Sequence, residues 1–128
     1  AKDLSNIVFI PKIKKDQVQH MLSLFDVCFI GRRGTPLFDH GVSSNKYFDY
    51  MLAVKPVLVS SNKIKDPVEL ADSGIIVEPD LAKSIMEGIL LLHKMTIKER
   101  EELGKKGYEY VKEYHNFNYL SDKYSSLF

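Results

Sequence analysis

The residues best suited to bind a ligand lie between Gly41 and Met51, where a short polar loop runs into a helical pattern. Ser43, Ser44 and Asn45 are all residue types that cap helices, and Gly41 before them allows a tight turn. The first N–H groups of a helix have no intrahelical partner, and the helix dipole favours negative charge there. The pattern therefore predicts an anion site, suited to a diphosphate, at the start of this helix.

Two charged side chains in the same helix could add specificity to that site. Lys46 would place a positive charge beside a phosphate, and Asp49 would offer a carboxylate to the two hydroxyls of a ribose. A simpler interpretation is that the serines only cap the helix, while Lys46 and Asp49 form an exposed ion pair that contributes a few tenths of a kcal/mol. The residue types alone leave both interpretations open.

Two arginines form a second candidate contact for a charged ligand. Arg32 and Arg33 follow an apolar run, at the strand end where open α/β sheets bind ligands. They could meet a phosphate or an anionic acceptor, or they could be ordinary exposed loop residues.

The elements that must position these residues are apolar runs that alternate with helical patterns. Strands are expected at residues 7–10, 26–30, 57–60 and 75–77, and helices at 16–24, 45–54, 66–72, 81–94, 96–114 and from 117 to near the end. The alternation predicts an α/β fold, a Rossmann-like doubly wound parallel sheet of about four strands flanked by helices, with extra C-terminal helices. Residues 1–128 are expected to form one domain.

Local signals support two of the expected helices. Thr96 and Glu99 have the spacing of a capping box, which predicts a helix start at that point. Gly104 and Gly107 lower the helix propensity of the segment that follows, so we expect another element to pack closely against them.

Composition excludes several classes of protein. The chain has 18 Lys and Arg against 17 Asp and Glu, so its charge balance does not indicate a nucleic-acid partner. Cys28 is the single cysteine and cannot form an internal disulfide, which favours a reducing, cytoplasmic setting in which it acts as a small buried hydrophobe. No apolar run approaches the roughly 18 residues of a membrane span, and no signal peptide is recognisable.

The segment around the predicted anion site resembles the nucleotide-binding half of group 1 (family 4) glycosyltransferases of GT-B fold. It is most similar to a subgroup that carries G-[IV]-S-P-N-K-L-F-[DE]-Y-M followed by G-K-P-V, found among enzymes that build bacterial surface polysaccharides, including capsule and lipopolysaccharide. Ser44 stands in place of the usual Pro, and Val54 in place of the usual Gly. The matching residues are Gly41, Val42, Ser43, Asn45, Lys46, Phe48, Asp49, Tyr50, Met51, Lys55, Pro56 and Val57.

The resemblance implies a retaining transferase whose donor is a nucleotide-diphosphate sugar, either a UDP-sugar or a GDP-sugar. Residues 43–46 would hold the diphosphate, Asp49 the ribose, and the main chain at about Pro11 to Ile13 the nucleobase. Alternatively, this last segment is a plain strand exit with solvated lysines. Asp49 corresponds to the second acid of the family's E-x7-E pattern, but the first acid falls on Gly41 and is lacking. Asp39 or His40 could contact the sugar instead, or could be solvated loop residues. The family requires no metal and no other cofactor.

The resemblance also implies that residues 1–128 are most of a C-terminal donor-binding domain. The family's acceptor domain, and the Arg/Lys pair that also holds the donor diphosphate, would lie upstream. We therefore expect part of a donor site, no catalytic residue and no activity in this chain alone. The acceptor of the full-length enzyme would be a glycan or a lipid-linked sugar, and the expected location is the cytoplasm, with membrane association at its inner face as an alternative.

Two other functions fit the same pattern. One is a GT-B sugar-nucleotide epimerase domain, and the other is a non-enzymatic doubly wound interaction domain. The glycosyltransferase resemblance implies that the last helix packs on the first domain of the full-length enzyme, so in this chain alone its apolar stripe should fold onto its own domain or onto a neighbouring chain. That stripe comprises Phe117, Leu120, Tyr124, Leu127 and Phe128.

Overall fold

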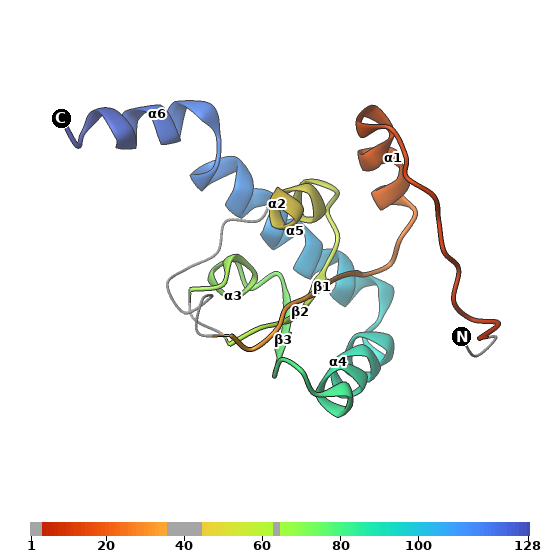
Figure 1. The fold of residues 1–128 in the computed structure, drawn as a ribbon. Coiled ribbons are helices and arrows are strands. Elements are labelled where there is room, and N and C mark those ends of the chain that lie inside the picture. The colour runs from red at the N-terminus through yellow and green to blue at the C-terminus, as the bar shows by residue number, and fades with distance from the viewer. Residues whose placement is uncertain (1–3, 36–44, 63–64) are drawn as a thin grey trace.

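A computed structural model describes residues 4–35, 45–62 and 65–128 of the chain (Figure 1). Strands alternate with helices in its first half and helices follow, which confirms the α/β prediction. In chain order the elements are the 3-10 helix η1 (Lys15–Gln17), α1 (Val18–Ser23), β1 (Cys28–Gly31), α2 (Asn45–Leu52), β2 (Val57–Ser60), α3 (Pro67–Leu70), β3 (Gly74–Val77), α4 (Ala82–Lys94), α5 (Ile97–Tyr114) and α6 (Phe117–Ser125).

The described strands form one parallel sheet in the order β1-β2-β3. Cys28 pairs with Val57 in the first ladder, and Val57 pairs with Gly74 in the second. All four residues of the central strand β2 are buried, which explains the apolar run of its first three residues.

The expected strand at residues 7–10 is wrong, so the described sheet has three strands rather than about four. This segment has no strand pairing, and Val8 and Phe9 are 80% and 93% exposed. Residues 4–14 run outside the sheet (Figure 1). An apolar run forms a strand only where a neighbouring strand satisfies its backbone groups, and no described strand lies beside this one.

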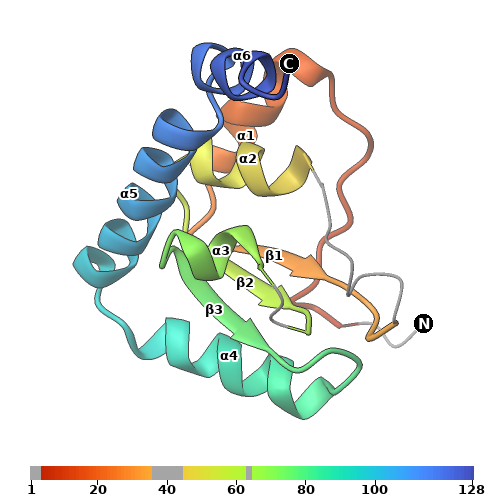
Figure 2. The same ribbon diagram turned by 90° about the vertical axis from the view of Figure 1, so that its left-hand side faces the viewer.

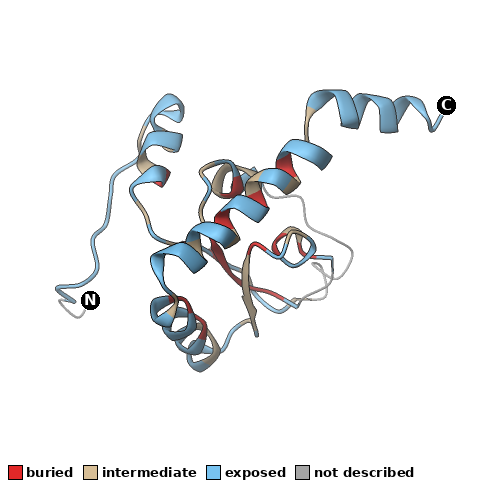
Figure 3. Ribbon diagram, turned by 180° about the vertical axis from the view of Figure 1, so that it is seen from behind, coloured by how far each residue is buried: buried red, intermediate tan, exposed pale blue. Residues whose placement is uncertain are grey.

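Helices cover the two faces of the sheet unequally (Figure 2). One face packs against α2, α3 and α5 in a core cluster that includes Tyr47, Met51, Val59, Val68 and Val111. The other face is covered by α4, whose Gly88 lies against Leu58. Buried residues concentrate on the inner sides of these helices (Figure 3).

The close packing expected at the two glycines of α5 is confirmed. A Cβ at Gly104 would lie 2.1 Å from the carbonyl oxygen of Val54, so α5 approaches the backbone just after α2. A Cβ at Gly107 would lie 3.0 Å from side-chain atoms of Met51 and Ser73.

The start of α5 is the predicted capping box. The N–H of Thr96 donates to Glu99 Oε2 at 2.7 Å, and the N–H of Glu99 donates to Thr96 Oγ1 at 3.2 Å. These two bonds satisfy backbone donors that the helix itself leaves unpaired.

The last helix, α6, projects away from the body of the molecule (Figure 1, Figure 3). Phe117 is 93% exposed and Phe128 is 94% exposed. The expectation that this helix folds back onto its own domain is therefore wrong, because most of its apolar stripe stays exposed. Its packing onto a neighbouring chain stays a prediction.

Across the described ranges, no helix is long and apolar enough to cross a membrane.

Candidate functional site

The helix α2 begins at the carboxyl edge of the sheet, where β1 ends (Figure 2). Asn45 and Lys46 are exposed at this tip, and Asp49 is half-buried one turn further along the same helix. Three of the predicted site residues thus share one helix, whose first two residues are exposed. Gly41, Ser43 and Ser44 lie outside the described residues, as do Asp39 and His40.

The side chains of Lys46 and Asp49 do not form the ion pair that the simpler interpretation assigned to them. Both residues are described, and neither takes part in an ion pair of the described chain. The main-chain carbonyl of Asp49 accepts a hydrogen bond from Gln19 Nε2 at 3.1 Å, which fixes this turn of α2 against α1. The carboxylate of Asp49 is not paired with Lys46.

Ile13 is not brought to the start of α2. It is half-buried in residues 4–14, a segment at the far end of α2 from the Asn45 tip (Figure 1). The cause is the failure of residues 7–10 to join the sheet, since a strand there would have carried Ile13 to the carboxyl edge.

Behind the start of α2, a buried network joins this helix to the end of β2 and to the start of α3. The Tyr47 hydroxyl donates to Asp66 Oδ2 at 2.6 Å, and the Ser61 hydroxyl donates to the same oxygen at 3.2 Å. Asp66 Oδ1 accepts from the Val68 N–H at 2.9 Å and so caps α3. Burial raises the pKa of Tyr47 far above its usual range, and the hydrogen bond to Asp66 raises it further. Tyr47 is therefore a fixed hydrogen-bond donor.

Arg32 lies beside this network. Its guanidinium carbon is 4.7 Å from the centre of the Tyr47 ring. The backbone N–H of Arg32 donates to the carbonyl of Ser60 at 3.1 Å. Arg33, the other candidate arginine, is exposed. Arg32 thus places its positive charge against the buried ring of Tyr47, a residue in the first turn of α2.

A cavity of about 490 Å³ opens at the carboxyl ends of β2 and β3. Its lining includes Ser61, which connects it to the network behind α2. Nearby, the N–H of Gly34 donates to Asp80 Oδ2 at 2.7 Å and joins the segments that follow β1 and β3. The lining residues are Ser61, Asn62, Glu78, Pro79 and Leu81.

The sequence pattern did not indicate Tyr47, Ser61 or Asp66 as site residues. One signal for Asp66 was present, because an aspartate directly before a proline is typical of a helix cap with Pro in the first turn. Nothing in the sequence pairs Asp66 with Tyr47, because that contact depends on how α2 and α3 lie on the sheet.

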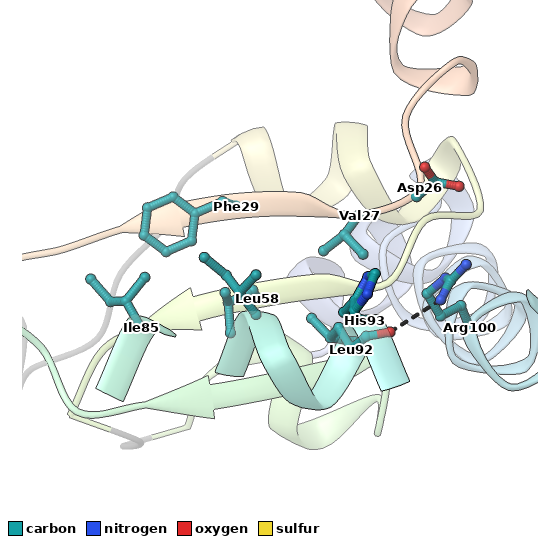
Figure 4. Close-up of a pocket in the computed structure, with 9 residues that line it drawn as sticks. Asp26, Val27, Phe29, Leu58, Ile85, Leu92, His93 and Arg100 are labelled. Carbon is teal, nitrogen blue, oxygen red and sulfur yellow. Dashed lines mark hydrogen bonds between the residues drawn. The ribbon is translucent and has the colours of Figure 1, made fainter. Parts of the chain in front are cut away.

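A second cavity, of about 450 Å³, lies on the opposite face of the sheet between β1 and α4 (Figure 4). Its walls are apolar near Phe29 and Ile85, and its other end holds Asp26, His93 and Arg100 (Figure 4). Arg100 donates to the carbonyls that end α4, at 3.1 Å and 2.7 Å, and so has a structural role.

Cys28 is buried in β1, as expected. Burial raises the pKa of its thiol to about 11, an increase opposed by the charge of Lys55. A thiol with this pKa is not a nucleophile at neutral pH.

Among the described residues, no group of three or more His, Cys, Asp and Glu side chains could hold a metal ion.

Comparison of the chain with models of protein families, with curated proteins and with solved structures finds no match.

Proposed function

We propose that this domain binds the donor of a glycosyltransferase, a nucleotide-diphosphate sugar, at the start of α2. The observation that carries the proposal is the open helix tip, with Asn45 and Lys46 exposed where β1 ends and Arg32 beside the first turn. Helix N-termini at the carboxyl edge of a parallel sheet are suited to phosphate groups.

In this proposal the diphosphate accepts hydrogen bonds from the first N–H groups of α2, and Lys46 and Arg32 supply positive charge. Asp49, one turn deeper, accepts the ribose hydroxyls. The cavity of about 490 Å³ beside Ser61 gives the sugar or its phosphate room at the same edge. The transfer itself would require an acceptor domain in a longer protein, where the acceptor is a glycan or a lipid-linked sugar of a bacterial surface polysaccharide. By the same resemblance, the transfer would retain the anomeric configuration of the sugar.

Titration calorimetry with UDP and GDP tests the proposal. The chain should bind one of them, and Asp49→Asn should weaken binding by about 1–3 kcal/mol because charged hydrogen bonds to the ribose are lost. Asp122→Asn, an exposed acid on α6, is the matched control and should leave the affinity unchanged.

Comparing nucleotides separates the parts of the site. Lys46→Met should weaken UDP or GDP more than the corresponding nucleoside, because only the nucleotides carry the diphosphate. Equal affinity of Asp49→Asn and the unchanged chain would contradict the ribose assignment. Absence of binding to either nucleotide would leave the interaction domain as the better interpretation.

A further inference from the structure

The cavity of about 450 Å³ between β1 and α4 arises because α4 covers only part of its face of the sheet (Figure 4). A Cβ at Gly88 would lie 2.6 Å from Leu58 Cδ1 and 2.9 Å from Val77 Cγ1, so the helix packs closely over β2 and β3. Phe29 of β1 is the register partner of Leu58, yet it is 46% exposed whereas Leu58 is 1% exposed. The part of this face that lies over β1 is therefore open.

The cavity has the size and the walls of a small-molecule site. Volumes of about 300–1,000 Å³, with mostly apolar walls and a few polar groups, are typical of such sites. Ile85, Ile89 and Leu92 recur at helical spacing on α4 and line one wall, while Phe29 lines the other. An aromatic group suits these walls, because contact with the ring of Phe29 adds to the burial of apolar surface.

Arg100 is a fixed cation at the other end of the cavity (Figure 4). Its Nη1 donates to the carbonyls of Leu92 and Met95, at 3.1 Å and 2.7 Å, and these two bonds hold the guanidinium in place. Within the described ranges its side chain makes no other hydrogen bond and no ion pair. The Nε and Nη2 groups are left for a ligand, and this edge of a guanidinium can bind both oxygens of one carboxylate.

Asp26 places a negative charge at the same end of the cavity (Figure 4). It is exposed, and it forms no ion pair with any residue that the structure describes. A ligand with only a carboxylate would be attracted by Arg100 and repelled by Asp26, and a ligand with only an amine would meet the reverse. A head group that carries both an ammonium and a carboxylate complements both side chains.

We propose that this cavity binds an aromatic α-amino acid. Arg100 binds the carboxylate of the ligand, Asp26 accepts a hydrogen bond from its ammonium group, and the aromatic side chain lies beside Phe29. The seven residues from Ile85 to Leu92 on α4 span about 10 Å, which suits one extended amino acid rather than a long acyl chain. The site is on the opposite face of the sheet from α2, so it is separate from the proposed nucleotide site.

An NMR titration of the isotope-labelled 128-residue chain with three related compounds tests the proposal. Phenylalanine has both charged groups, 3-phenylpropionate lacks the ammonium, and 2-phenylethylamine lacks the carboxylate. Phenylalanine should bind about tenfold more tightly than either analogue, because each analogue leaves one charged side chain of the cavity without its partner. Equal affinity for the three compounds, or no binding of phenylalanine at millimolar concentration, overturns the proposal.

A substitution of the acid tests its assigned role. Asp26→Asn should abolish the preference for phenylalanine over 3-phenylpropionate, because the neutral amide neither attracts the ammonium nor repels the carboxylate. Asp122→Asn makes the same change at an exposed position of α6 and should keep the preference. A preference that survives in Asp26→Asn overturns the pairing of this acid with the ammonium.

A second pair of variants tests the location. Ile85→Trp should fill the apolar end and abolish binding of phenylalanine, whereas Met86→Trp should leave it intact. Met86 is the next residue of α4, is 52% exposed and does not line the cavity. Circular dichroism checks that both variants fold.

The titration of the unchanged chain keeps the location testable if Ile85→Trp does not fold. Phenylalanine should shift the amide signals of Phe29 and Ile89 and leave those of α6 in place. Shifts confined to other parts of the chain overturn the proposal. None of these measurements involves a nucleotide, so their failure is distinct from failure of the proposed function.

Discussion

Val54 offers a test of the backbone that joins α2 to β2. Its φ is 58°, in the left-handed region, where a residue with a Cβ pays roughly 1–2 kcal/mol relative to glycine. We therefore expect Val54→Gly to be more stable than Val54→Ala.

The magnitude follows from comparing these two variants. Both remove the apolar valine side chain, so its loss largely cancels in the difference between them. Glycine gains about 1–2 kcal/mol from relief of the left-handed conformation and loses about 0.5–1 kcal/mol to the greater freedom of the unfolded chain. The free energy of unfolding should then be higher for Val54→Gly by about 0.5–1 kcal/mol.

Urea unfolding followed by circular dichroism measures this difference. At Lys105, an exposed position inside α5, the order should reverse, with Lys105→Ala more stable than Lys105→Gly by about 1 kcal/mol. If alanine were the more stable choice at both positions, Val54 would not be left-handed in solution and the reasoning would fail.

Three further predictions concern packing and pH. Asp66→Ala should lower the free energy of unfolding by about 3–5 kcal/mol, since it removes a helix cap and the acceptor of two buried hydroxyls. Tyr47→Phe removes only one hydrogen-bond donor and should lower the free energy of unfolding by about 1–2 kcal/mol. Urea unfolding of both variants checks these values. Gly104→Ala should lower stability by about 1–3 kcal/mol in the same assay, because the new Cβ would lie 2.1 Å from a backbone carbonyl oxygen. Gly107→Ala should cost less, because its new Cβ would lie 3.0 Å from its nearest neighbours. Burial, and to a smaller extent the charge of Lys123, lowers the pKa of His115 below its ordinary value of 6.5. The stabilisation from neutral His115 is therefore complete above pH 6.5 and is lost as the pH falls from 6.5 through the lowered pKa. The free energy of unfolding, measured over a pH series, should no longer show this fall in His115→Gln.

The parts of the fold that local sequence determines were predicted well. The strand at 57–60 has the expected bounds, because a short apolar run led by a proline reads as a buried strand. The capping box at Thr96 was also predictable, since it depends on two side chains three residues apart. The glycines of α5 indicated a close contact, although not that α2 supplies it.

The parts that depend on distant neighbours were not predictable in the same way. Residues 7–10 have the composition of a strand, yet the described sheet gives them no neighbour, and this also separates Ile13 from the helix tip. Within the candidate site, the start of α2 followed from capping residues. The bond between Tyr47 and Asp66 crosses 19 positions of sequence and required the folded arrangement of two helices.

The burial of Cys28 has a practical consequence for measuring the sheet's motions. Only the thiolate reacts with alkylating reagents, and a thiol with a pKa of about 11 holds almost none of it at neutral pH. Labelling of the folded chain must therefore wait for β1 to detach and expose the sulfur to water. Because the chain has no other cysteine, the rate of alkylation reports how often that one strand opens.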